Sequence, residues 1–209
     1  MCVIIAAIKN TCIENADVFT LEHRLWGTEA YKNLVYAQLA YDNNGFIVKF
    51  TVEEKNPLRE KKRHLEYVHE DSCVEFFVNF LPEYSEKYIN FEVNAAGIMN
   101  AGFQSGRHDS VPLKEEEISG LHIKAEVLEN QWTVMYHISF DFIKKYYPEF
   151  EMQNCKYIKG NLYKCGDKTE MEHYVSCFKV GTEKPDYHRP EFFGKIYVDA
   201  SCFANKKIV

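Results

Sequence analysis

The stretch CVEFFVNF at residues 73–80 alternates apolar and polar side chains with a period of two, and YINFEVNA at residues 88–95 repeats the pattern. A period of two is that of a β-strand with one face turned toward a core. The loop between the two stretches is short enough to join neighbouring antiparallel strands. The two stretches therefore predict a β-hairpin with one apolar and one polar face.

The register of this hairpin follows from its apolar faces. Both faces point at the core only if paired residue numbers have an odd sum, because a slip by one residue turns a face outward. The length of the loop favours a sum of 167, which places Glu75 directly across from Glu92. Two carboxylates with Cβ atoms about 5 Å apart repel each other unless a cation or a hydrogen-bonding group lies between them.

The same period recurs on either side of this hairpin. Residues 121–127 and 132–140 alternate around a short turn, and residues 34–41 and 46–52 flank the turn sequence DNNG. The stretch 139–147, which a proline ends, is the only predicted helix. Many strands with little helix predict an all-β fold.

The arrangement expected for these strands is an antiparallel β-sandwich, immunoglobulin-like or jelly-roll-like, with one short helix. Residues 53–72 and 104–119 are the least hydrophobic stretches and are predicted to be long loops. No repeat or linker divides the sequence, so residues 1–209 are predicted to form a single domain.

The composition excludes several classes of protein. Charged residues make up 27% and hydrophobic residues 46% of the chain, which excludes a disordered or coiled-coil protein. A net charge of −6 argues against nucleic acid or an anionic membrane as a partner. Seven cysteines without a C-x-x-C pair predict neither a disulfide framework nor a zinc site.

The N-terminal apolar stretch is followed directly by Lys9 and has no basic residue before it, so it is predicted to be a strand and not a signal peptide. No apolar run approaches the length of a membrane span. The chain as it stands is therefore predicted to be cytoplasmic, and secreted if a leader has been removed. The sequence leaves the oligomeric state open.

The polar face of the hairpin at residues 73–95 suggests a function. It carries acids, amides and aromatic rings, namely Glu75, Phe77, Asn79, Tyr88, Asn90, Glu92 and Asn94. Carboxylates and amides hydrogen-bond hydroxyl groups, and rings stack on C–H surfaces, which together suit sugar recognition. The alternative is a solvated sheet face whose polar residues keep the protein in solution.

Four segments carry a resemblance to a known family. HEDSCVEFFVNF (69–80), YINFEVNAAG (88–97), GNLYKCGD (160–167) and YHRPEFFGKIYVD (187–199) resemble the family 9 carbohydrate-binding modules and their DOMON-like relatives. The resemblance covers most of the chain in order. It implies a β-sandwich that holds the end of a polysaccharide chain, or a free sugar, between two tryptophans.

The resemblance also implies a set of ligand-binding residues. Glu75 matches the sugar-binding glutamate of the family, and Glu92 stands where the xylanase-attached modules have an arginine. Lys164 is the predicted replacement for that lost cation. The stacking tryptophans are replaced by other residues at or beside their positions. The predicted ligand-binding residues are Tyr67, His69, Glu75, Phe77, Glu92, Asn94, Lys164 and Phe178.

Two further consequences concern cofactors and other residues. Modules of this family can carry structural calcium, but no dense run of carboxylates marks such a site here, and no cofactor is predicted. Trp26 is interpreted as a core or a rim residue, with the core favoured. Cys73 is interpreted as a packing residue, and the sequence HRP at 188–190 as a structural turn.

Three alternatives to non-catalytic sugar binding stay open. The pair Glu75 and Glu92 could act as general acid and base, since retaining glycosidases hold such groups about 5–5.5 Å apart. A DOMON-type domain could bind haem, with His69 as the candidate axial ligand beside the site. The third alternative is a scaffold that has kept the sandwich and lost its ligand, since the stacking tryptophans are absent.

Overall fold

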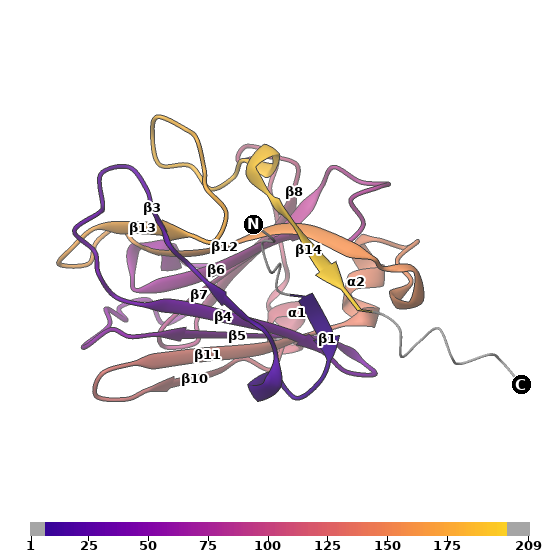
Figure 1. Cartoon of the computed structure of the whole chain (residues 1–209), viewed down its shortest axis with the longest axis horizontal. Coiled ribbons are helices and arrows are strands. Elements are labelled where there is room, and N and C mark those ends of the chain that lie inside the picture. The colour runs from indigo at the N-terminus through magenta and orange to yellow at the C-terminus, as the bar shows by residue number, and fades with distance from the viewer. Residues whose placement is uncertain (1–6, 200–209) are drawn as a thin grey trace, which may run out of the picture.

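The computed structural model describes residues 7–199, which form two layers of strands (Figure 1). The strands are β1 (Ala7–Asn10), β2 (Val18–Thr20), β3 (His23–Arg24), β4 (Val35–Tyr41), β5 (Gly45–Val52), β6 (Cys73–Asn79), β7 (Tyr88–Asn94), β8 (Met99–Gln104), β9 (Val111–Pro112), β10 (Lys124–Val127), β11 (Trp132–Ser139), β12 (Tyr157–Gly166), β13 (His173–Ser176) and β14 (Gly194–Val198). The helices are α1 (Glu115–Ser119) and α2 (Phe140–Tyr146), with short 3-10 turns at Ile13–Asn15, Val68–Glu70, Met152–Asn154 and Pro190–Phe192. Within the described residues no helix is long and apolar enough to cross a membrane.

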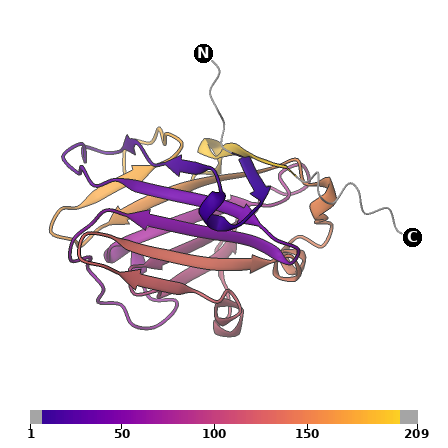
Figure 2. The ribbon, with the colours of Figure 1, turned by 60° about the horizontal axis from the view of Figure 1, so that its bottom comes forward.

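The two layers are parts of one curled sheet. Strands β4, β5, β10 and β11 make one layer, which comes forward in Figure 2, and β6, β7, β8, β12, β13 and β14 make the other. The short strand β1 joins the layers, because it pairs with β4 and with β14, in both cases in parallel. The sandwich prediction is confirmed in outline, but the prediction of a strictly antiparallel sheet is wrong.

The central hairpin has the predicted register. Strands β6 and β7 pair antiparallel with Glu75 opposite Glu92. Strand β12 adds to the other edge of β6 and places Tyr163 opposite Glu75, while β8 adds to β7 and places Asn100 opposite Glu92. Four side chains thus form a row across four strands on one face of this layer. The predicted hairpins β4–β5 and β10–β11 also form.

The main core lies between the two layers. It takes the alternate residues of β6 and β7 that the period of two assigns to an apolar face, including Val74, Phe76 and Phe91, which are 0–1% exposed. The predicted helix is α2, where the Ser139 hydroxyl accepts a hydrogen bond from the backbone N–H of Phe142. The prediction of one helix is wrong, because α1 forms inside the stretch 104–119 that was expected to be a loop.

The opposite face of the β6–β7 layer is also covered. Loops that precede β4 and β6, together with the loop between β13 and β14, pack on it through a second apolar cluster. The β13–β14 loop is the gold segment that stands above the sheet in Figure 1. The members of this cluster are Leu25, Val68, Cys73, Phe77, Tyr88, Tyr163, Cys165, Tyr174, Val180 and Tyr187. The interpretation of this polar face as solvated is therefore wrong, since Glu75 is 3% and Glu92 4% exposed.

Candidate functional site

A pocket of about 370 Å³ opens between these loops and the buried polar face. Its floor is formed by side chains of β6, β7 and β8, and its walls come from the loops around Trp26, around Tyr67, after β8 and before β14. Because the sheet is regular, neighbouring strands deliver the floor residues in rows. The loops then enclose a site that the strands alone would leave open.

Glu92 lies on the pocket floor and is buried by the loops that cover the sheet. Its Oε1 accepts a hydrogen bond from Asn90 Nδ2 at 2.7 Å, and its Oε2 accepts one from Asn100 Nδ2 at 3.1 Å. His69 Nδ1 lies 3.9 Å from Oε2. Burial acts to raise the pKa of Glu92, but the interaction with the His69 imidazole, together with the hydrogen bond from Asn100, outweighs it and lowers that pKa. Glu92 is therefore the ionised member of the pair.

Glu75 is the neutral member. Burial, the Cys165 thiol and the charge of Glu92 raise the pKa of Glu75 well above its usual value. The Cys165 thiol donates to Glu75 Oε1 at 3.0 Å. The repulsion expected for two carboxylates on directly opposed residues is thus removed, because one of them keeps its proton. One carboxyl can then donate and both can accept hydrogen bonds.

His69 places an imidazole beside this pair, 3.9 Å from Glu92 Oε2. The carboxylate of Glu92 raises the pKa of His69 against the opposing effect of burial. On its other side, His69 Nε2 lies 4.0 Å from an oxygen of Asp167. The imidazole therefore sits between two acidic groups that both line the pocket. This arrangement favours the protonated ring.

A second histidine forms part of the wall. His188 Nδ1 lies 2.7 Å from the side-chain amide nitrogen of Gln104 and 3.0 Å from the Tyr88 hydroxyl. Burial lowers the pKa of His188, so the ring is neutral. Because an amide NH₂ group donates, Nδ1 is assigned as the acceptor and Nε2 carries the proton. His188 is thus a ligand-binding candidate, and its interpretation as part of a purely structural turn is incomplete.

Aromatic residues and an ion pair form the rim. Tyr67 is 69% exposed, and its ring centroid lies 5.7 Å from that of His69. Trp26 packs against two tyrosines with centroids 5.4 Å away and donates from Nε1 to the carbonyl of Thr182 at 2.8 Å. It lines the pocket and also packs against the second apolar cluster, so it is a rim residue, the less favoured of its two interpretations. Arg107 pairs with Asp186 at 2.8 Å and brings a guanidinium to the same opening.

Five of the eight predicted ligand-binding residues line this pocket, namely Tyr67, His69, Glu75, Phe77 and Glu92. The structure places the other three elsewhere. Asn94 Nδ2 donates to Asp71 Oδ2 at 2.8 Å, and Asn94 Oδ1 accepts from the backbone N–H groups of Ala96 and Ile98 at 3.0 Å. Asn94 therefore shapes the turn after β7.

Phe178 packs over Gly194, where even a Cβ would lie 2.5 Å from its ring. Its backbone N–H and C=O both bond the amide of Asn161, which fixes the loop after β13 to β12. The ring joins the main core and not the pocket. The structure thus gives Phe178 a packing role in place of the predicted stacking role.

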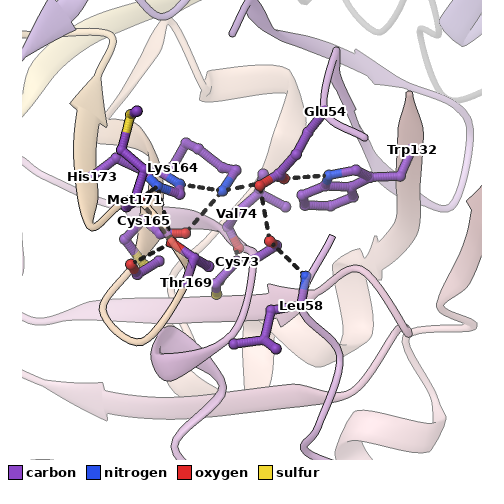
Figure 3. A network of polar contacts seen from close by, with 12 residues as sticks. Glu54, Leu58, Cys73, Val74, Trp132, Lys164, Cys165, Thr169, Met171 and His173 are labelled. Atoms are coloured by element: carbon purple, nitrogen blue, oxygen red, sulfur yellow. Dashed lines mark hydrogen bonds and ion pairs between the residues drawn. The ribbon is translucent and has the colours of Figure 1, made fainter. Parts of the chain in front are cut away.

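Lys164 points to the opposite face of β12, into the core between the layers. Its ammonium lies 3.6 Å from Glu54 Oε2 and donates to the carbonyl of Cys165 at 2.9 Å (Figure 3). The Trp132 indole also donates to Glu54 Oε2, at 2.7 Å. The prediction that Lys164 balances Glu75 is wrong, because its neighbours Tyr163 and Cys165 lie in the second apolar cluster on the pocket side of the sheet, and alternation along the strand turns Lys164 to the other side.

Sequence reasoning missed several pocket residues outside the central hairpin. They are Trp26, Asn100, Gln104, Arg107, Ser110, Tyr174, Pro185, Asp186, Tyr187 and His188. Asn100 and Gln104 lie on β8 at the positions that pair with Glu92 and Tyr88, so the register argument extended by one strand finds them. The loop residues carry no periodic signal.

The fold and the pocket together are those of a β-sandwich with a polar pocket over one sheet face. Comparison with protein families gives a match to carbohydrate-binding family 9 over residues 8–198. The chain belongs to this family, which confirms the resemblance found in the sequence. A search of curated proteins found no match.

Solved structures share the fold. A protein from Bacteroides uniformis described as a candidate carbohydrate-binding protein is 24% identical, with a TM-score of 0.77 over 92% of this chain and 97% of that one. A family 9 module from Caldicellulosiruptor kristjanssonii, solved with cellotriose, is 12% identical, with a TM-score of 0.65 over 92% of both chains. A family 9 module from the same organism, solved with glucose, is 13% identical, with a TM-score of 0.63 over 95% of this chain and 92% of that one.

Proposed function

We propose that this protein binds the end of a carbohydrate chain, or a free sugar, in the pocket over β6, β7 and β8, without catalysing a reaction. The observation that carries the proposal is the row of hydrogen-bonding groups on the pocket floor. Glu75 is neutral, Glu92 is charged, and His69 lies beside Glu92. A sugar presents several hydroxyl groups that each donate and accept, which matches this mixture.

An unsatisfied acceptor supports the same conclusion. Asn90 lines the pocket and is 3% exposed, and its Oδ1 has no hydrogen-bond partner among the described residues. A buried polar atom without a partner costs free energy, so such atoms call for an explanation. Because Asn90 Nδ2 is already held by Glu92, the free oxygen is available to a ligand hydroxyl.

The relatives suggest which ligands to test first. Structures of similar fold were solved with cellotriose and with glucose. A panel that begins with glucose, cellobiose and cellotriose and extends to other mono- and oligosaccharides should contain at least one ligand, measured by isothermal titration calorimetry and by NMR chemical-shift changes. A panel that gives neither heat nor shift changes would contradict the proposal.

Replacing Glu75 by Ala is expected to weaken binding of that ligand by about 1 kcal/mol or more, roughly fivefold. The reason is that the carboxyl group lines the pocket and offers both a donor and an acceptor. Calorimetry on the variant measures the change. Thermal unfolding checks that the variant stays folded, and unchanged affinity in a folded variant would exclude Glu75 from the binding site.

Replacing Tyr67 by Ala is expected to weaken carbohydrate binding by about 1 kcal/mol, roughly fivefold, with the free energy of unfolding changed by less than about 0.5 kcal/mol. Tyr67 is 69% exposed at the rim, so its ring contributes little to the fold and is free to stack on a sugar. The matched control is Tyr84→Ala, since Tyr84 is 77% exposed and does not line this pocket. Equal effects of the two variants would argue against stacking at the rim.

The absence of catalysis is tested on the same protein. No turnover of an activated aryl glycoside is expected at enzyme-like rates, even though Glu75 and Glu92 are directly opposed. If the wild type releases the chromophore and the Glu92→Gln variant does not, the carboxyl pair acts as general acid and base.

A further inference from the structure

Two thiols lie beside the carboxyl group of Glu75. Cys73 and Cys165 are directly opposed on the neighbouring strands β6 and β12. Their sulfur atoms and one oxygen of Glu75 all lie within 4.8 Å of one another. All three side chains are buried, at 0%, 1% and 3% exposure respectively. Among the described residues, these three side chains place their ligand atoms close enough together to hold a metal ion.

The chemistry of this group selects the kind of ion. Two thiolates and one carboxylate suit a zinc-like, thiophilic divalent cation. Calcium does not fit, because it takes six to eight oxygen ligands and this cluster offers only one carboxyl group. Zn–S bonds of about 2.3 Å in a tetrahedron place two sulfur atoms about 3.8 Å apart, which falls inside the 4.8 Å that encloses the three ligand atoms.

The cluster is also open on one side. Glu75 and Cys165 line the ligand pocket, whereas Cys73 does not. An ion can therefore reach the cluster through the pocket. Three protein ligands with one open position is an arrangement that zinc sites use.

We propose that Cys73, Cys165 and Glu75 bind one thiophilic divalent cation of the zinc class at the floor of the pocket. The cation replaces the thiol and carboxyl protons, which bulk solvent takes up. It occupies Glu75 in the process, so it competes with any ligand that needs this carboxyl group. The site goes beyond the carbohydrate-binding proposal and does not depend on it.

The ligands of such a site must lose their protons before they bind the cation. Binding therefore releases protons and is expected to become tighter as the pH rises.

The test uses the full chain, reduced, freed of reductant and kept without oxygen. Cd²⁺ serves as the probe because its thiolate complexes have an ultraviolet charge-transfer band. The wild-type protein is expected to bind one tight equivalent with this band, and ¹¹³Cd NMR is expected to report two sulfur ligands. The double variant C73S/C165S is expected to lose this equivalent, with affinity reduced by more than the roughly 10- to 100-fold that loss of an outer-shell partner costs.

Two further variants separate the cluster from ordinary thiol binding. C155S removes another buried cysteine outside the cluster and is expected to bind Cd²⁺ as the wild type does. E75Q keeps both thiols, so it is expected to retain the charge-transfer band and to bind about 10-fold or more weakly. Because ¹¹³Cd NMR on the wild type already counts the sulfur ligands, the test holds even where a variant fails to fold.

Two results would overturn the proposal. The first is a reduced wild-type protein that binds no tight Cd²⁺. The second is equal binding by the wild type and a folded C73S/C165S variant.

Discussion

Replacing Glu54 by Gln is expected to lower the free energy of unfolding by about 3–5 kcal/mol, the largest effect on stability that the structure predicts. Lys164 is completely buried, and Glu54 is its ion-pair partner at 3.6 Å. Burial acts to lower the pKa of Lys164, but the acidic neighbours Tyr31 and Glu54 outweigh it and raise that pKa. The glutamine would leave a buried ammonium group without a counter-charge.

The partners of Glu54 add to this effect. Its Oε1 accepts from the Ser72 hydroxyl at 3.0 Å and its Oε2 accepts from the Trp132 indole at 2.7 Å. A glutamine amide keeps one oxygen and turns the other position into a donor, so it faces one of these donors with a second donor. A hydrogen bond in the core is then lost together with the ion pair; Figure 3 shows both contacts of Glu54, to Trp132 and to Lys164.

Urea or guanidinium unfolding of the variant measures the loss, with Glu53→Gln as the matched control. Glu53 is the exposed neighbour in the chain, and its replacement is expected to change stability by less than about 0.5 kcal/mol. The double variant Glu54→Gln with Lys164→Met is expected to recover much of the loss, because the uncompensated charge is removed. A loss below about 1 kcal/mol in the single variant would mean that the pair does not hold the core together.

This network also connects the core to the pocket. Lys164 lies between Tyr163 and Cys165, whose side chains contribute to the opposite face of β12. Fixing Lys164 in the core therefore fixes the direction of both neighbours. The strand carries a core ion pair on one side and part of the ligand pocket on the other.

The hairpin of β6 and β7 was predictable because its two apolar faces allow only one parity of register. That parity, with the loop length, was enough to place Glu75 opposite Glu92. The burial of the polar face was not predictable in the same way. It depends on loops before β6 and before β14, whose sequences have no period and whose positions are fixed by contacts far away in the chain.

The direction of Lys164 on β12 could not be predicted from the sequence, and the reason is physical. Ile158, Leu162 and Lys164 share one face, and the first two are fully buried in the main core. A period of two therefore places Lys164 in the core, but lysine is almost never fully buried unless it is paired. Its partner, Glu54, lies in a stretch with the composition of a loop. Only the three-dimensional structure brings the pair together.

Replacing Glu92 by Gln is expected to reduce carbohydrate affinity by about 10- to 150-fold, because a hydrogen bond to a charged group contributes about 1.5–3 kcal/mol. Glu92 is the charged acceptor of the pocket floor, held by Asn90 and Asn100 and accompanied by His69. The glutamine is similar in shape but neutral. It also places a donor against one of the two asparagine amides, so one of the hydrogen bonds that hold the side chain is lost together with the charge.

Calorimetry with the best ligand of the carbohydrate panel measures this loss, and Glu129→Gln, in the exposed turn between β10 and β11, is the matched control with unchanged affinity. Comparison with Glu75→Ala then separates the two carboxyl groups. If Glu92 is the ionised member, its neutral variant loses more affinity than removal of the neutral Glu75 does, because only Glu92 offers a full charge to the ligand hydroxyls. The reverse order of effects would place the charge on Glu75, and the assignment of protonation states to the pair would have to be exchanged.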